Sequence, residues 1–296
     1  MGKIGYIFAK CWAYGMAICP FWLIYLRSDL YYLIVYHVAR YRRKTVRQNL
    51  LRSFPEKPSK EIKTIERHFY RNLCDVVVET AKLFLMKPDD LKKRIAFTNP
   101  EMIMDLYKED KNVFLAFPHS GNWEWFGKLM HTLSPHSDVA VYKKLKDPYF
   151  ERFMYDLRIG YHIPNQEMVE SSHVLQSLLR RRDLLNRVLI VADQTSYGRE
   201  TDYWNIFMHQ ETCWFFGLER MAVKLDYAVV FVAMRRTGRG RYEVTFHLIT
   251  DAPKTTEKGF IMEQYSQHIE RFINGQPDNW LWSHRRWKHS RKQEVA

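Results

Sequence analysis

A histidine and a glutamate stand five positions apart in the segment N-V-F-L-A-F-P-H-S-G-N-W-E-W, residues 112–125. A carboxylate that contacts one nitrogen of an imidazole fixes the tautomer and raises the basicity of the other nitrogen. The pair His119 and Glu124 is therefore suited to removing a proton from a hydroxyl nucleophile. On a regular helix the two side chains would diverge by about 140°. They can meet if His119 lies in the loop before the helix.

The flanking residues predict that arrangement. Residues 112–117 have the pattern of a buried strand, and Pro118 ends it because proline cannot donate to a β-ladder. His119 then falls at the carboxyl end of the strand, where open α/β sheets hold their ligands. Asn122 is a typical N-cap residue, so the next helix should carry Glu124 in its first turn.

The spacing of the pair is weakly specific by itself, because the chain contains 12 His and 33 Asp or Glu residues. Two other histidines have a carboxylate at the same spacing, but one lies in a charged tail and the other in a polar loop. Only His119 follows an apolar strand. The alternative that His119 is a capping or core histidine stays open on the spacing alone.

The chain carries 46 Lys and Arg against 33 Asp and Glu, a formal net charge of +13. Such a charge indicates an anionic partner: nucleic acid, an acidic membrane surface, an acidic carrier protein or a phosphorylated substrate. We expect no nucleic acid partner, because zinc-finger spacing, RNA-recognition signatures and basic heptads are absent from the sequence. The four cysteines form no C-x-x-C pair, which argues against a zinc site, a redox centre or a disulfide framework. We therefore expect neither a metal nor a cofactor.

The N-terminus predicts association with a membrane. Residues 11–26 and 30–39 are uncharged and rich in tryptophan and tyrosine, which prefer the headgroup level of a bilayer. The basic cluster 40–52 follows directly and would face anionic lipid on the cytoplasmic side. No small-residue cleavage site follows the apolar stretch, so it does not read as a signal peptide. We expect a membrane-associated helical segment at residues 1–40.

The mode of this membrane contact stays open. A spanning helix needs about 20 apolar residues, and Pro20 interrupts the first uncharged run. One tilted helix that starts near Ile4 and a re-entrant helical hairpin both fit the pattern. A buried aromatic helix pair in a soluble core is the alternative to any membrane contact.

Residues 41–296 alternate between helical and strand patterns and are expected to form one catalytic domain. Apolar residues at helical spacing predict a helix over 59–86. Strands rich in Val, Ile and Phe, separated by helices, are typical of a sheet covered on both faces. The expected fold class is α/β, a mostly parallel mixed sheet flanked by helices. The predicted strands are 112–117, 138–143, 187–193, 227–235 and 242–249, and the further predicted helices are 122–131, 147–158, 172–185, 211–225 and 257–274.

The segment H-S-G-N-W-E resembles the H-x4-D/E acyltransferase motif of the lipid A late acyltransferases, the lauroyl and myristoyl transferases of Gram-negative bacteria. Further elements similar to that family follow in order along most of the chain. They are V-R-Q-N-L-L-R-S-F-P at 46–55, Tyr142 with Asp147 and Pro148, Arg158, V-A-D-Q at 191–194, and N-W-L-W-S-H-R-R-W-K at 279–288.

The resemblance implies a fold like that of glycerolipid acyltransferases and transfer of a fatty acyl chain from an acyl thioester to a hydroxyl of a lipid A precursor. The donor would be acyl-acyl carrier protein or acyl-CoA, and the site would lie on the cytoplasmic side of the bacterial inner membrane. His119 would be the general base, oriented by Glu124. Backbone N–H groups near Asn122 would stabilise the oxyanion.

Two further residues receive roles through the resemblance. Arg158 would hold a phosphate or the phosphopantetheine of the carrier, and Asp193 would anchor that arginine or an acceptor hydroxyl. The alternatives are a surface ion pair for Arg158 and a structural strand-end cap for Asp193. His284, Arg285 and Arg286 are interpreted as a structural or phosphate-contacting element rather than as catalytic residues.

The sequence also departs from the family pattern. Gln194 follows Asp193 where several relatives have histidine, and the Glu-Gly-Thr-Arg block of glycerolipid acyltransferases is absent. The acceptor and the length of the acyl chain therefore stay open. A glycerophospholipid, an aminolipid or another glycolipid is the alternative acceptor, and a non-catalytic membrane or nucleic acid binder is the alternative class of protein.

Overall fold

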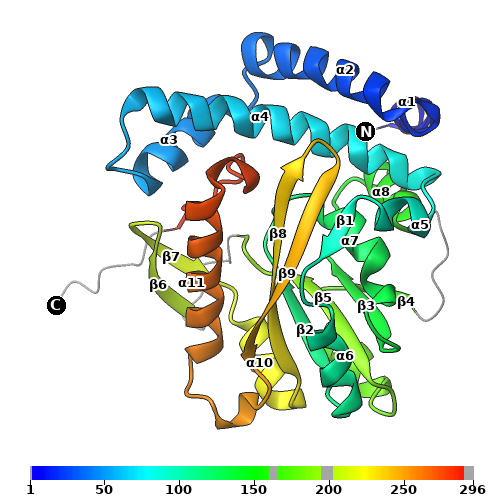
Figure 1. Ribbon diagram of the computed structural model, residues 1–296, viewed down its shortest axis with the longest axis vertical. Coiled ribbons are helices and arrows are strands. Elements are labelled where there is room, and N and C mark those ends of the chain that lie inside the picture. Colours follow the sequence, from blue (N-terminus) through cyan, green and yellow to red (C-terminus); the bar gives the residue numbers. More distant parts are fainter. Residues whose placement is uncertain (1, 160–165, 195–202, 290–296) are drawn as a thin grey trace.

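The computed structural model describes residues 2–159, 166–194 and 203–289 of the chain. A seven-stranded sheet in the order β1-β9-β8-β2-β5-β3-β4 forms its centre (Figure 1). All neighbouring strands are parallel except β8 and β9, so the predicted mostly parallel mixed sheet is confirmed. The strands are β1 (Ile95–Phe97), β2 (Val113–Phe117), β3 (Ser137–Tyr142), β4 (Gln166–Glu170), β5 (Asn186–Val191), β8 (Ala228–Gly238) and β9 (Arg241–Thr250).

Helices cover both faces of the sheet. The five residues of β2 are all buried, and they alternate between two cores as the twofold period of a strand requires. Phe114 and Ala116 face a core shared with α9 (Val174–Arg180), α10 (Gly217–Leu225) and α11 (Phe260–Gly275). Val113, Leu115 and Phe117 face the other core, shared with α6 (Glu101–Lys108), α7 (Trp123–Leu129) and α8 (Pro148–Ile159).

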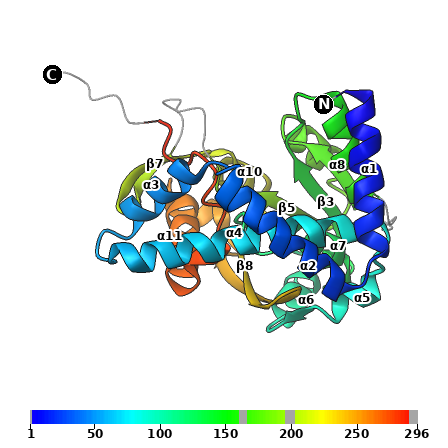
Figure 2. The same ribbon diagram turned by 90° about the horizontal axis from the view of Figure 1, so that it is seen from above.

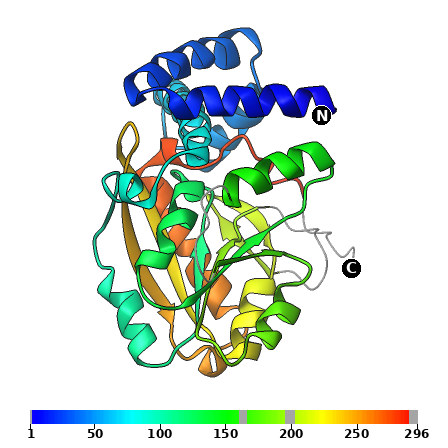
Figure 3. The same ribbon diagram turned by 90° about the vertical axis from the view of Figure 1, so that its right-hand side faces the viewer.

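Several of the remaining helices gather at one end of the sheet. Figures 1 and 3 show α1, α2 and α4 across the end at which β8 terminates, which is the carboxyl end of the parallel strands. The predicted helix 59–86 is present as α4 (Ser59–Ala81) followed by the 3-10 turn η2 (Lys82–Phe84). The others are α1 (Lys3–Ile18), α2 (Phe21–Tyr32), the π-helix η1 (Leu33–Val38), α3 (Arg43–Ser53), α5 (Pro88–Lys92) and the 3-10 turns η3 (Met130–Thr132), η4 (Pro253–Thr255) and η5 (Pro277–Asn279).

The predicted helix 211–225 is wrong at its beginning. Residues 203–207 and 210–214 instead form an antiparallel hairpin, β6 (Tyr203–Phe207) and β7 (Gln210–Trp214). The two residues between these strands adopt the left-handed conformation, with φ of 50° at Met208 and 61° at His209. That geometry reverses the chain in two residues. The helix α10 begins only at Gly217, and the short elements β1, β4, α5 and α6 were not predicted either.

The N-terminal segment forms two helices that run in different directions and are separated at Cys19 and Pro20 (Figure 2). Ala13, Met16 and Ile24 belong to the core that contains β2, so this segment packs on the sheet domain. Its other face is apolar and exposed. Among the described residues, no helix combines the length and the apolar character needed to cross a bilayer.

Candidate active site

His119 and Asp193 stand side by side at the carboxyl edge of the sheet. β2 and β5 are parallel neighbours, and Phe117 pairs with Val191 in their register. His119 lies two positions after Phe117, and Asp193 lies two positions after Val191. Asp193 accepts a hydrogen bond of 2.9 Å from the His119 backbone N–H through Oδ2 and contacts His119 Nδ1 at 2.5 Å through Oδ1. One carboxylate therefore holds both the main chain and the ring of the histidine.

The hydrogen bonds around the ring define its tautomer. Nδ1 faces a carboxylate and so carries the proton, whereas Nε2 faces the amide nitrogen of Gln194 at 3.1 Å and so accepts. Gln194 is exposed, so a substrate can replace its amide. Burial raises the pKa of the Asp193 carboxyl, but the His119 ring and the donated hydrogen bonds outweigh burial, and the pKa lies below its ordinary value. Asp193 is thus an anion that holds the proton on Nδ1 and leaves Nε2 as the acceptor.

The C-terminal segment completes this arrangement. Trp280 Nε1 donates to Asp193 Oδ2 at 2.7 Å, and the Leu281 backbone N–H donates to the His119 carbonyl at 3.1 Å. A bridge between Ser120 and Trp280 adds a third link. The tryptophan was not predicted as a site residue, although it lies within the N-W-L-W-S-H-R-R-W-K motif. Arg286 is buried and its guanidinium donates to the Cys213 carbonyl at 2.7 Å, a contact within the protein.

Glu124 contacts Arg158 rather than the imidazole. The two carboxylate oxygens accept from Arg158 Nε at 2.9 Å and Nη2 at 2.6 Å, a bidentate pair. Burial lowers the pKa of the arginine, but the Glu124 carboxylate outweighs burial and leaves a net rise. The sequence predicted Glu124 as the partner of the His119 ring, and the structure differs because Asp193 occupies Nδ1. Of the two partners predicted for Asp193, Arg158 is paired with Glu124 instead, and the contact of Asp193 with an acceptor hydroxyl stays a prediction.

Asn122 is the N-cap of α7, as predicted. Its side-chain oxygen accepts from the Trp125 backbone N–H at 3.2 Å, and its amide donates to Glu79 at 3.2 Å. Asn122 is fully buried, so its side chain holds the turn after His119 rather than facing a substrate. Complete burial raises the pKa of Glu79, which also accepts from the hydroxyls of Tyr242 at 2.5 Å and Tyr25 at 3.1 Å. Glu79 was missed by the sequence analysis, since a carboxylate in a long amphipathic helix has no distinguishing pattern.

A narrow groove lies beside His119, between α4 and the C-terminal segment. Its volume of about 30 Å³ holds little more than one water molecule. Most of the α4 wall is apolar. The lining residues are Phe69, Asn72, Leu73, Val76, His119, Gly121, Trp123, Asp278, Asn279, Trp280 and Leu281. In the described ranges, no group of three or more His, Cys, Asp and Glu side chains is arranged to hold a metal ion.

The fold and the site define an α/β enzyme with a histidine and carboxylate pair at the carboxyl edge of a parallel sheet. The family model described as bacterial lipid A biosynthesis acyltransferase matches residues 6–289. The chain therefore belongs to this family and is an acyltransferase, which confirms the resemblance seen in its motifs. A Haemophilus influenzae protein named lipid A biosynthesis acyltransferase is 22% identical over 257 residues, which cover 83% of this chain and 76% of the relative.

Proposed function

We propose that this acyltransferase moves a fatty acyl chain from an acyl thioester to a hydroxyl of a lipid A precursor, with His119 as general base. Membership of the family supports the reaction class and the acceptor class. The observation that carries the mechanism is the ring geometry: Nδ1 contacts the buried Asp193 carboxylate, and Nε2 faces the exposed side chain of Gln194. An acceptor hydroxyl that displaces the Gln194 amide would donate its proton to Nε2.

The reaction then needs no covalent enzyme intermediate. Nε2 of His119 takes the hydroxyl proton while the acceptor oxygen attacks the thioester carbonyl. The tetrahedral intermediate collapses, the carbon–sulfur bond breaks, and the imidazolium returns the proton to the departing thiolate. The products are an ester and a free thiol. Asp193 is a positioning residue here: it keeps the proton on Nδ1 and stabilises the imidazolium.

The Glu124 and Arg158 pair is assigned to substrate binding. The Arg158 side chain is 26% exposed, so part of its guanidinium remains available while Glu124 fixes its orientation. A planar guanidinium held in this way binds phosphate well. We assign to it a phosphate of the carrier's phosphopantetheine arm or of the acceptor. Glu124 acts through this arginine, and Asn122 acts by holding the turn whose backbone N–H groups face the oxyanion.

The N-terminal helices are proposed to lie on the cytoplasmic face of the bacterial inner membrane. Their exposed face is apolar, as in an interfacial helix, which inserts its apolar side chains into the boundary between headgroups and acyl chains. The basic residues 40–52 follow it and favour anionic lipid. Residues 1–40 then form the membrane-associated segment and residues 41–296 the catalytic domain. The exposed large apolar residues of the membrane-associated segment are Ile4, Ile7, Phe8, Tyr14, Ile18, Trp22, Leu26, Leu30, Leu33, Ile34 and Val38.

The donor is proposed to be acyl-acyl carrier protein, with acyl-CoA as the alternative. A formal charge of +13 favours an acidic carrier protein as partner. Neither metal nor cofactor enters the proposed steps.

The decisive experiment measures transfer with purified protein, acyl-acyl carrier protein and a lipid A precursor. His119→Ala is expected to abolish acyl transfer, and a variant that retains the wild-type rate would overturn the mechanism. Mass spectrometry of lipid A from cells that lack the protein tests the acceptor. A reduced number of acyl chains is expected, whereas an unchanged number would point to a glycerophospholipid, an aminolipid or another glycolipid.

A further inference from the structure

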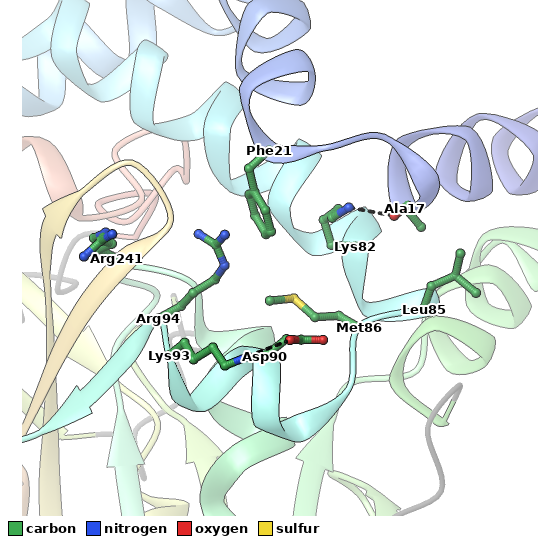
Figure 4. A pocket seen from close by; sticks show the side chains of 9 residues that line it. All are labelled: Ala17, Phe21, Lys82, Leu85, Met86, Asp90, Lys93, Arg94 and Arg241. Carbon is green, nitrogen blue, oxygen red and sulfur yellow. Dashed lines mark hydrogen bonds and ion pairs between the residues drawn. The ribbon is translucent and has the colours of Figure 1, made fainter.

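A second cavity lies beside the turn η2, which directly follows the C-terminal end of α4. Its volume is about 300 Å³, and it opens between the junction of α1 and α2, the turn η2, the helix α5 and the start of β9 (Figure 4). It shares no lining residue with the groove beside His119. The proposed mechanism leaves this cavity without a role.

Positive charge dominates the cavity. Lys82, Lys93, Arg94 and Arg241 line it together with one carboxylate, Asp90. Asp90 Oδ1 lies 3.5 Å from Lys93 Nζ, and both of these side chains are exposed. Four cations and one carboxylate in a single cavity leave an excess of positive charge that an anion would neutralise.

Of the four cations, Lys82 is buried and Arg94 is half-buried. The ammonium of Lys82, a residue only 9% exposed, donates to the carbonyls of Ala17 and Cys19 at 2.6 Å each. These contacts use two of its three N–H donors. Arg94 donates to the Gly240 carbonyl at 3.2 Å. Over the described part of the chain, neither cation forms an ion pair with a carboxylate.

Burial and mutual repulsion destabilise the charged forms of these groups. Burial lowers the pKa of Lys82, and the nearby Arg94 lowers it further. Burial also lowers the pKa of Arg94, and Arg241 adds to that effect although Glu79 opposes it. The guanidinium carbon of Arg94 lies 3.2 Å from the centre of the Phe21 ring, which keeps this cation at the cavity wall. A bound anion would stabilise the charged forms of Lys82 and Arg94 against burial and against their mutual repulsion.

We propose that this cavity binds the phosphate group of a membrane-lipid headgroup. Its apolar wall, Phe21, begins the helix that presents Trp22 and Leu26, which are 69% and 61% exposed. Ile18 at the end of α1 is 75% exposed. Acyl chains of a lipid held at this position could lie against that apolar face while the phosphate enters the basic cavity. The proposal rests on the proposed bilayer contact of α1 and α2, and it does not depend on the catalytic mechanism.

The test uses the full chain and a pair of matched double variants. Lys93→Gln with Arg241→Gln removes two exposed charges from the cavity and leaves the buried Lys82 and the half-buried Arg94 in place. The control, Arg180→Gln with Lys224→Gln, removes two exposed charges at the ends of α9 and α10, outside both the cavity and the basic segment 40–52. Inorganic phosphate at constant ionic strength probes the cavity in solution. Phosphatidylcholine vesicles with and without phosphatidic acid probe the headgroup.

Phosphate at ten times its Kd is expected to raise the Tm of the wild type and of the control variant by about 3 °C, and to leave the Tm of the cavity variant unchanged. The cavity variant is expected to bind phosphatidate vesicles about tenfold more weakly than the control variant. Equal Tm shifts in both variants would overturn the assignment of phosphate binding to this cavity. A Tm difference with equal vesicle binding would overturn the lipid assignment in favour of a soluble phosphate. Failure of the wild type to bind either kind of vesicle would instead reject the bilayer contact.

Discussion

His119 and Asp193 occupy equivalent positions on neighbouring parallel strands, each two residues beyond the register pair of Phe117 and Val191. The sheet itself therefore sets the distance between the base and its carboxylate. Asp193 contacts both the backbone and the ring of His119, so the loop after β2 and the orientation of the imidazole are fixed by one side chain. This relationship explains why the ring presents Nε2 rather than Nδ1 to the exposed side of the site.

Asp193→Asn should lower kcat on the order of 10³-fold with little change in KM. The amide can donate to Nδ1 and so favours the tautomer with the proton on Nε2, which cannot accept the hydroxyl proton. Steady-state kinetics with acyl-acyl carrier protein as donor measure this effect. Gln194→Ala is the matched control, since it removes the contact at Nε2 without changing the tautomer. A loss in the control as large as that in Asp193→Asn would contradict the assignment of the positioning role to Asp193.

The Glu124 and Arg158 pair should behave as one unit in a double-mutant cycle. Glu124→Gln removes the carboxylate that holds Arg158 Nη2 at 2.6 Å and Nε at 2.9 Å. Arg158→Gln leaves the Glu124 carboxylate, whose side chain is 11% exposed, without its partner. We expect each single variant to lower kcat/KM by about 10- to 100-fold. The double variant should fall no further than the worse single variant, a coupling of about 1 to 3 kcal/mol. Additive losses would show that Glu124 also acts independently of the arginine.

The sequence predicted the strand at 112–117, the loop position of His119 and the start of α7 because these depend on local rules: an apolar run, a proline and an N-cap. It did not predict that Asp193 would be the ring's partner, although it named Asp193 as a site residue. The two residues are 74 positions apart, and their contact follows from the pairing of β2 with β5. One sequence contains no direct signal for which strands are neighbours. The same local pattern, an apolar strand followed two positions later by a polar residue, is present at His119 and at Asp193.

Trp280→Phe should reduce kcat about tenfold while leaving the fold intact. Phenylalanine preserves much of the ring packing against Trp282 and Phe207 but removes the N–H that donates to Asp193 at 2.7 Å. The carboxylate would lose one of its three donors, and a lost hydrogen bond to a charged group costs about 1.5 to 3 kcal/mol. Kinetics and thermal unfolding should be measured together. A large fall in Tm with unchanged kcat would mean that the tryptophan serves packing alone.

Trp22→Ser with Leu26→Ser should weaken binding to anionic vesicles by about 100-fold. Both side chains are more than half exposed, and their insertion would remove a large apolar area from water. Vesicle flotation measures the loss. Ile206→Ser with Leu248→Ser is the matched control, because these residues are 65% and 42% exposed on β6 and β9, away from the N-terminal helices. Equal loss in both double variants would remove the support for an oriented contact through α1 and α2.

Acid should destabilise the protein between pH 6.5 and pH 4, in part through His136. Burial lowers the pKa of this side chain from 6.5 to about 4, and the nearby Arg187 adds to the effect although the hydrogen bond to the Lys111 carbonyl opposes it. In this pH range the unfolded chain binds a proton that folded His136 does not accept. The contribution to stability is therefore complete above pH 6.5 and is lost as pH falls toward 4, by at most about 3 kcal/mol.

His136→Gln should make the free energy of unfolding less dependent on pH over this range, because glutamine does not titrate. It should also lower stability at pH 7, since the ring accepts from Ser134 at 2.6 Å and donates to the Lys111 carbonyl at 2.9 Å in a buried setting. The dependence will not vanish, because burial also lowers the pKa of His268 and of His284 to about 4. Denaturant unfolding at several pH values measures the slope. His173→Gln, on a side chain 61% exposed, is the control that should leave the slope unchanged, and an equal change in both variants would refute the assignment to His136.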